Sequence, residues 1–324
     1  MNPNRRHLAT RAAALAALAL GGQRAVAQPS AAPIRLLVGA SPGGSTDTIA
    51  REIAPETSRL LGRPVIVENR AGAGGNLAAE AVAKAAPDGS TLLVSFTSHA
   101  VNATLYPKLP FDPIADFTPL TLLGTAYSVL VAHPSVPVKD VRELIAYAKS
   151  RPGQLSFALG GIGSSLHLAG DMLKMQAGLY IVNIPYRGTT PAITDVIAGH
   201  VPLMVAPLGG VRAHVQAGRL KLLGVTSPKR LAQLPDVPAI AEVLPGYESA
   251  AWWGLFGPAR MAPEVARPIA DAARAAVATD AMRRRLEADG GQPVGNGSEE
   301  FARFVKTEID RYAKVVRYAG ATPE

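Results

Sequence analysis

Short apolar runs alternate with longer amphipathic stretches through most of the chain. The apolar runs are rich in Val, Ile and Leu and show little alternation with polar residues, which is typical of strands buried on both faces. We predict strands at these runs, at residues 34–38, 65–68, 91–95, 128–132, 155–158, 181–185, 203–206, 220–225 and 252–256.

Amphipathic stretches of helical length fill most of the intervals between these runs. We predict helices there, at residues 46–61, 76–86, 138–150, 164–178, 190–199 and 211–218, and at the C-terminal end at 263–279, 280–289 and 298–318. Strands that alternate with helices favour parallel pairing. The pattern therefore predicts an α/β fold with parallel-rich sheets.

The first 27 residues differ from the rest of the chain. Three arginines precede an Ala/Leu run at residues 12–20 and an Ala-x-Ala site at residues 25–27. This pattern is typical of a cleavable signal peptide, and the apolar run is shorter than the roughly 20 residues that a membrane-spanning helix needs. We expect cleavage after Ala27 and export to the periplasm. The Arg5-Arg6 pair is also a loose twin-arginine match, so both export routes stay open.

Charge and composition narrow the class of ligand. The leader holds four of the 33 basic residues and none of the 25 acidic residues, so the exported chain has a net charge of +4. This small positive net charge suits an anionic small molecule as ligand. The lack of a basic tract with interleaved aromatics argues against nucleic acid as a partner. The absence of cysteine excludes disulfides, thiolate metal sites and an N-terminal lipid anchor.

Two stretches indicate where the chain would cross between lobes. Residues 125–137 combine one long strand with two prolines, and a strand near residues 222–227 returns before a Pro-rich loop. We expect residues 28–132 and 226–324 to form one lobe and residues 133–225 the other. A two-strand hinge of this kind can close on a ligand.

Two Gly-rich turns, SPGGSTD at residues 41–47 and GGIGSSLHLAG at residues 160–170, each follow a predicted strand and open a predicted helix. The free N–H groups and the dipole of such a helix stabilise a nearby anion, by roughly 0.3–1 kcal/mol for the dipole. Glycine permits close approach of the backbone or a positive φ. An N-capped turn without a ligand would have the same pattern. The candidate ligand-binding residues in these turns are Ser41, Gly43, Gly44, Ser45, Thr46, Gly161, Ile162, Gly163, Ser164, Ser165 and His167.

Other catalytic and cofactor patterns are absent. Neither turn, nor GAGGN at residues 72–76, matches the dinucleotide or P-loop motif. Ser164 and His167 raise nucleophilic catalysis as an alternative, but no G-x-S-x-G elbow is present. Without an HExxH motif or cysteine, we expect no zinc site. Tyr186 and Arg187 end a predicted strand, where an arginine can form a bidentate pair with a carboxylate or lie in solvent.

Seven segments, in order along the mature chain, resemble the substrate-binding proteins of tripartite tricarboxylate transporters, the Bug family. They read PGGSTDTIAR, VIVENRAGAGGN, AKAAPDGSTLL, NATLYPKLPFDPIADFTPL, IPYRGTTPAITDVIAGHV, RLAQLPDVPAIAEVLPGYE and WWGLFGP. The resemblance implies a periplasmic, two-lobed "Venus flytrap" of the type II kind that captures small carboxylates without catalysis or a cofactor.

The resemblance also implies roles for individual loops. The loops at residues 41–46 and 161–165 would hold the ligand carboxylate through backbone N–H groups and ordered water, and the loop with Thr97, Ser98 and His99 would close one side of the pocket. Gly39 and Ala40 stand where relatives often have Pro and an aromatic residue. The resulting loss of an aromatic wall would leave room for a bulkier acid.

We expect a monomer that binds a small organic carboxylate, whether a dicarboxylate, a tricarboxylate, an aromatic acid or an amino acid, and delivers it to the membrane subunits of a tripartite tricarboxylate transporter. Arg187 replaces the lysine common in the family and could bind a second carboxylate bidentately. Two alternatives stay open at this point: a hydrolase that uses Ser164 and His167, and a sensor subunit that presents its ligand to a signalling receptor.

Overall fold

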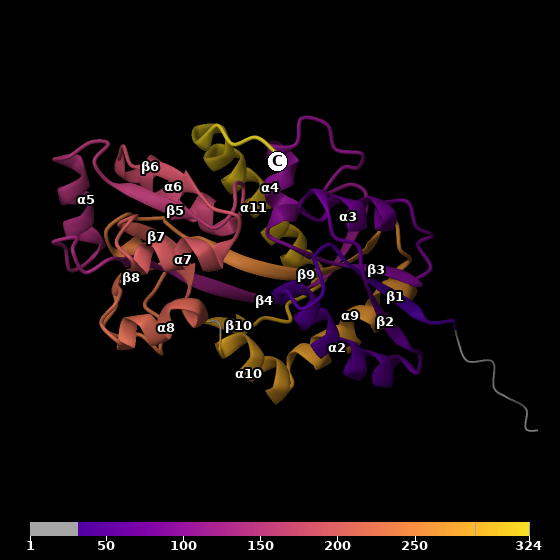
Figure 1. The fold of residues 1–324 in the computed structure, drawn as a ribbon. Coiled ribbons are helices and arrows are strands. Elements are labelled where there is room, and N and C mark those ends of the chain that lie inside the picture. The colour runs from indigo at the N-terminus through magenta and orange to yellow at the C-terminus, as the bar shows by residue number, and fades with distance from the viewer. Residues whose placement is uncertain (1–31, 289, 324) are drawn as a thin grey trace, which may run out of the picture. The chain divides into compact units, whose positions relative to one another are not determined.

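The computed structural model describes residues 32–288 and 290–323, and the predicted signal peptide at residues 1–27 lies outside this part of the chain. Figure 1 shows the arrangement of the helices and strands. The strands are β1 (Ile34–Val38), β2 (Val65–Asn69), β3 (Thr91–Phe96), β4 (Phe117–Ala132), β5 (Ser156–Leu159), β6 (Val182–Pro185), β7 (Leu203–Pro207), β8 (Lys221–Val225), β9 (Ala250–Pro258) and β10 (Gly291–Pro293).

The α-helices lie mostly between the strands, as predicted, and three of them follow β9. They are α2 (Ser45–Leu61), α3 (Asn76–Ala83), α4 (Ser98–Leu105), α5 (Val141–Lys149), α6 (Ser165–Ala177), α7 (Thr189–Ile197), α8 (Leu208–Gln216), α9 (Pro263–Val277), α10 (Asp280–Ala288) and α11 (Ser298–Ala319). Short 3₁₀ helices, η1 (Ala73–Gly75) and η2 (Ile240–Glu242), lie in the connecting loops.

The strands form one mixed sheet in the order β2-β1-β3-β9-β4-β7-β5-β6, with β8 and β10 also paired to β4. The pairs β1–β2, β1–β3, β5–β6 and β5–β7 are parallel, as the alternation of strands and helices predicts. The pairs made by β4 and β9 are antiparallel. The sheet is therefore mixed, since β4 and β9 run through its middle in opposite directions.

The long strand β4 connects two groups of strands. Its first part pairs with β9 and β10, and its last part, Ser128–Ala132, pairs with β7 and β8. Only residues 128–132 were expected to form a strand here. Residues 117–127 were missed because Pro119, Thr121 and Thr125 interrupt the apolar run, whereas pairing with β9, and with β10 at residues 124–126, holds them extended.

The helices begin and end where their sequences favour it. Helix α2 begins after Gly44 and ends at Gly62, and helix α6 begins after Ser164 and ends at Gly178. Both terminal glycines have left-handed backbone conformations, with φ of 61° and 63°, which glycine adopts without a steric penalty. The two helices therefore start directly at the two Gly-rich turns.

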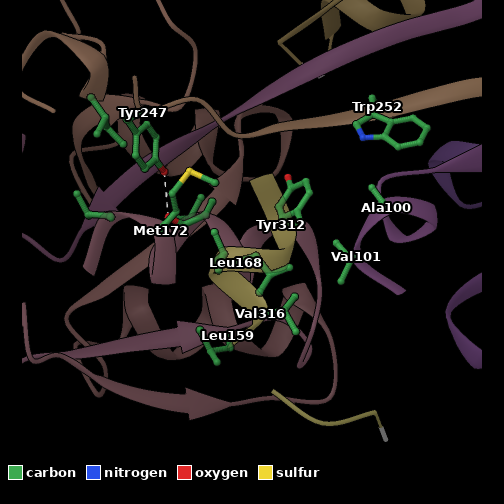
Figure 2. Packing of buried hydrophobic residues seen from close by; sticks show 14 of the residues in the cluster. Ala100, Val101, Leu159, Leu168, Met172, Tyr247, Trp252, Tyr312 and Val316 are labelled. Atoms are coloured by element: carbon green, nitrogen blue, oxygen red, sulfur yellow. Dashed lines mark hydrogen bonds between the residues drawn. The ribbon is translucent and has the colours of Figure 1, made fainter. Parts of the chain in front are cut away.

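The C-terminal helix α11 links the two groups of strands by packing. It contacts α4, which follows β3, and α6, which follows β5. Figure 2 shows Tyr312 and Val316 of α11 between Leu168 of α6 and Val101 of α4, in a core in which the Tyr247 hydroxyl donates a hydrogen bond to the carbonyl of Ala169 at 3.0 Å. Burial of these side chains makes α11 a shared support for helices on either side of β4.

Candidate functional site

A cavity of about 280 Å³ lies where four segments of the chain meet. We call residues 40–47 the first loop and residues 160–167 the second loop. The other two segments are the turn from β3 into α4 and the start of β9. The lining residues are Ala40, Gly44, Ser45, Thr46, Phe96, Thr97, Ser98, Gly163, Ser164, Ser165, Ala251, Trp252 and Trp253.

The first loop is a tight turn held by a side chain of the following helix. The Gly44 amide donates to the Ser41 carbonyl at 3.3 Å, and Gly43 has a φ of +81°, as in a type II turn. The Gly43 amide donates to Asp47 Oδ2 at 2.9 Å. The turn is therefore fixed by an acceptor four residues further along the chain.

Asp47 is 3% exposed and carries several bonds at once. Its carboxylate also accepts from Arg51 Nε at 3.0 Å and from Asn69 Nδ2 at 2.9 Å. The hydrogen bond from Arg51 is the main reason that the pKa of Asp47 lies below its usual value, against the opposing effect of burial. The first loop is thus anchored by a carboxylate that stays ionised.

The second loop repeats this turn with different residues. The Ser164 amide donates to the Gly161 carbonyl at 3.4 Å, and Gly163 has a φ of +72°. The Gly163 amide donates to Nδ1 of His167 at 2.9 Å, again four residues further along. Ser164 caps the helix, since its Oγ accepts from the His167 amide at 3.2 Å.

Two helix N-termini therefore meet at one cavity. The first amides of an α-helix have no acceptor within the helix. In α2 these free amides include those of Ser45 and Thr46. The residue before the helix, Gly44, has no side chain that could accept a hydrogen bond from them. In α6 they include Ser165. The lining residues include no charged side chain, so the donors that the cavity offers an anion are amides and hydroxyls at the positive ends of two helix dipoles.

The turn after β3 and the strand β9 form the opposite wall. Thr97 Oγ1 accepts from the Trp252 amide at 3.0 Å, and Thr46 Oγ1 accepts from Trp253 Nε1 at 3.2 Å. Ser98 Oγ donates to the Gly74 carbonyl at 2.6 Å. These bonds join the first loop and the GAGGN segment to the cavity wall.

Aromatic residues that the sequence interpretation missed line this wall, namely Phe96 and the pair Trp252-Trp253. The WWGLFGP segment was predicted as a strand, but only its position between β3 and β4 brings it to the cavity. A β-carbon on Gly39 would lie 2.7 Å from Gly75 Cα, so glycine is required there by the close approach of the GAGGN segment. Ala40 does line the cavity.

Several candidate residues do not line the cavity. Ser41, Gly43, Gly161 and Ile162 belong to the two turns but lie outside the lining. The Tyr186 hydroxyl donates to Asp195 at 2.6 Å, and Arg187 is exposed. The sequence placed these two directly after a strand correctly, but neither lines the cavity.

The histidines near the cavity point into the protein. His99 is stacked on Phe256 and its Nε2 lies 2.8 Å from the Pro113 carbonyl; burial lowers its pKa to about 4. His167 is 4% exposed, with Nε2 at 2.8 Å from Asp171 Oδ2. Ser164 Oγ instead donates to the Gly161 carbonyl at 2.8 Å. Ser164 and His167 therefore do not form a nucleophile and base pair.

Across residues 32–288 and 290–323, no cluster of three or more His, Cys, Asp or Glu side chains could hold a metal ion. Within the same ranges, no helix combines the length and apolar character needed to cross a bilayer.

The chain matches a family model and a known protein over most of its length. The family model described as "Tripartite tricarboxylate transporter family receptor" matches residues 49–321. The chain is 36% identical to protein BugT of Bordetella pertussis over 294 residues, which is 90% of each chain.

Solved structures match over most of the chain. Rpa4515 of R. palustris, solved with adipate, is 34% identical, with a TM-score of 0.74 over 90% of this chain and 98% of that one. MatC of Rhodopseudomonas palustris, solved with bound malate, is also 34% identical, with a TM-score of 0.71 over 88% of this chain and 98% of that one. These matches confirm the predicted fold class, an α/β protein of the two-lobed periplasmic-binding-protein kind.

Proposed function

Because this chain belongs to the tripartite tricarboxylate transporter receptor family, whose members are periplasmic solute-binding proteins and not enzymes, we propose that it captures a small organic carboxylate in the cavity between the first and second loops. The observation that carries this proposal is the meeting of two helix N-termini at one cavity without a charged lining residue. Backbone amides there would bind a carboxylate and release it unchanged.

The donors are sufficient in number for useful affinity. A micromolar dissociation constant corresponds to about −8 kcal/mol. Each hydrogen bond to a charged group contributes roughly 1.5–3 kcal/mol, from which the cost of association is subtracted. The amides of Ser45, Thr46 and Ser165 and the nearby hydroxyls would supply five or six such bonds. Neither a metal nor a covalent bond is needed.

We propose a dicarboxylate as the first ligand class to test. Relatives at 34% identity were solved with adipate and with malate, both aliphatic dicarboxylates. The cavity of about 280 Å³ lies at the small end of the usual range for ligand pockets. Phe96 and Trp253 would pack against the aliphatic part of the ligand.

We propose that the two lobes comprise residues 28–132 with 226–324, and residues 133–225. Strand β4 ends at Ala132 and β8 ends at Val225, which supports these limits. The second loop would then approach the first by rotation about the β4 region. Gly163 supports this arrangement, since a β-carbon there would lie 2.9 Å from Leu105 Cδ2 at the end of α4, in the other proposed lobe.

We further propose export by a signal peptide cleaved after Ala27, and delivery of the ligand to the membrane subunits of a tripartite tricarboxylate transporter. The family membership supports the periplasm as the location. Uptake of labelled dicarboxylate by cells with and without the gene tests the transport role. Unchanged uptake, combined with binding by the purified protein, would count against transport.

The binding proposal is tested first with the purified mature protein. Native mass spectrometry identifies any ligand retained, and titration calorimetry with malate and adipate measures affinity. We expect one intact carboxylic acid to bind with a dissociation constant of about 1 μM. If no dicarboxylate, tricarboxylate, aromatic acid or amino acid binds, the proposed function is wrong.

Proline at the first residue of α6 tests whether the backbone amide of Ser165 donates to the ligand. Ser165→Pro removes one backbone donor but retains the helix, because the preceding Ser164 has φ −68° and ψ 157°, which suits a residue before proline. We expect a loss of roughly tenfold or more in affinity, in line with one charge-assisted hydrogen bond. Ser165→Ala retains the amide and should cost less, and Ser298→Pro at the start of α11 serves as the control for proline itself. Equal affinities of Ser165→Pro and Ser165→Ala would contradict the use of this amide.

A further inference from the structure

His167 lies at the cavity but does not face it. Its side chain is buried one turn inside α6, with Nδ1 at 2.9 Å from the Gly163 amide nitrogen. Its other ring nitrogen, Nε2, lies 2.8 Å from Asp171 Oδ2. Gly163 lines the cavity, whereas His167 does not. His167 therefore contacts the cavity only through the backbone of the second loop.

The hydrogen-bond partners determine the tautomer of His167. The Gly163 amide can only donate, so Nδ1 must present a lone pair. The ring proton of the neutral imidazole then lies on Nε2, facing the carboxylate of Asp171. A proton on Nδ1 would place two donors against each other and break the bond that holds the turn.

A buried set of polar groups holds Asp171 in place behind His167. Asp171 is 1% exposed and pairs with Lys174 on the same helix. Asn183 of β6 accepts from Lys174 Nζ at 2.8 Å through its Oδ1, and donates from its Nδ2 to Asp171 Oδ1 at 3.1 Å. Burial alone would raise the pKa of Asp171, but hydrogen bonds from His167 and Lys174 outweigh it and lower the pKa.

We propose that His167 is a positioning residue for ligand binding: it accepts the Gly163 amide, in the tautomer set by Asp171, and so aims the first amides of α6 into the cavity. Asp171 supports that tautomer as the acceptor for Nε2, and Lys174 and Asn183 hold Asp171 in place. The Nδ2 of Asn183 lies farther from Nε2, at 3.3 Å. This inference rests on the proposed function and assigns His167 no contact with the ligand.

The first loop supplies an independent precedent within the same chain. There the amide of Gly43 donates to Asp47, again a side-chain acceptor four residues after a glycine of positive φ. The common requirement is an acceptor without a proton at the contact atom. An asparagine at position 167 can meet it with Oδ1, whereas a leucine cannot.

The test compares His167→Leu and His167→Asn in the full mature protein. Titration with malate and adipate should give a loss of roughly tenfold or more for His167→Leu, consistent with one lost hydrogen bond to the turn. His167→Asn should recover most of the affinity. His200→Leu, at an exposed histidine, is the matched control and should bind as the unaltered protein does. Unaltered affinity in His167→Leu, or equal losses in the Leu and Asn variants, would overturn the proposal.

A spectroscopic measurement keeps the proposal testable if His167→Leu fails to fold. Long-range ¹H–¹⁵N NMR correlations of the unaltered protein report which ring nitrogen carries the proton. The expected result is a proton on Nε2 and an unprotonated Nδ1, and Asp171→Asn should weaken this preference. A proton on Nδ1 would overturn the positioning role. If no carboxylate binds the unaltered protein, the proposed function fails, while the NMR result still decides whether His167 holds the turn.

Discussion

The first and second loops share a backbone design and differ in the group that anchors them. In each, a turn contains a glycine of positive φ, whose amide donates to a side chain four residues later. The acceptor is the carboxylate of Asp47 in the first loop and the imidazole of His167 in the second. The same turn can therefore be fixed by a charged or by a neutral acceptor.

The surroundings of the two anchors explain this difference. Asp47 and His167 are both nearly inaccessible, but the partner of Asp47 reaches solvent: Arg51, with its side chain 53% exposed, balances its charge. His167 is buried, and the charge pair behind it, Asp171 with Lys174, is buried too. A neutral ring keeps net charge away from the second loop, because an unpaired buried charge is costly. The first loop thus depends on an ion pair and the second on a tautomer.

The largest difference in ligand affinity should be between variants of the two loops in which a glycine is replaced. A side chain at Gly163 meets both an unfavourable φ and Leu105, whereas a side chain at Gly43 meets only the unfavourable φ, with open space around it. Gly163→Val should retain the fold and abolish binding, a loss of at least about 100-fold when backbone strain and the displaced turn are combined. Gly43→Val should lose clearly less. Calorimetry with malate or adipate measures both.

A double variant shows whether contact with Leu105 causes the loss of affinity in Gly163→Val. Leu105→Ala in the Gly163→Val background should recover part of the affinity, because the two positions are in contact and their effects are not additive. Equal losses in Gly163→Val and Gly43→Val, with no recovery by Leu105→Ala, would remove this distinction between the loops.

A buried carboxyl outside both loops provides a reference for pH effects. Glu308 of α11 is 2% exposed and pairs with Arg311 at 2.9 Å. Burial raises its pKa to about 7, against the opposing effect of Arg311. The folded state therefore favours the protonated form, so its contribution to stability is full below the ordinary value of 4.5 and is lost as the pH rises through 7.

Glu308→Gln should remove this loss. The variant should gain about 2 kcal/mol relative to the unaltered protein between pH 5 and pH 8. Urea unfolding at both pH values measures the gain. A variant whose stability changes with pH as much as that of the unaltered protein would show that Glu308 is not the titrating group.

The ion pair of the first loop should have the opposite pH dependence. Hydrogen bonding to Arg51 lowers the pKa of Asp47, so the stability from its charge is full above the ordinary value of 3.8 and is lost as the pH falls through the folded value. Asp47→Asn retains an acceptor for Gly43 and should cost about 1 kcal/mol at pH 7, since Arg51 is half exposed to solvent. Urea unfolding at pH 7 and pH 3 should show this cost shrinking in acid; a constant cost would assign it to lost packing.

The smallest expected effect is on stability, through the N-terminal caps of the two helices. Ser164 caps α6 through its hydroxyl, while Gly44 begins α2 without a side-chain cap. Ser164→Gly makes the second loop like the first and should cost only a few tenths of a kcal/mol, whereas Ser164→Ala should cost about 1 kcal/mol. Thermal unfolding resolves the two. Equal costs would mean that the serine hydroxyl has another role in the loop.

Most of the strands and helices and both Gly-rich turns could be predicted from local sequence patterns. The turns were recognisable because glycine next to a predicted helix start is a local signal. Helix α4 and strand β10 were missed, since the first has mixed residues over only eight positions and the second is three residues long. The aromatic wall at Phe96 and Trp253 was missed because its position depends on pairing between β3 and β9, which are far apart in the chain.

The sequence by itself determined the α/β class, the two Gly-rich turns at helix starts and the family, because these depend on periodicity and short motifs. Tertiary structure alone decided which residues share the cavity, that Tyr186 and Arg187 lie outside its lining, and that His167 faces Asp171. The physical reason is that a side chain's partners come from strands and helices brought together by packing. His167 meets the amide of Gly163, four residues earlier, and the carboxylate of Asp171, which itself accepts from Asn183 of β6.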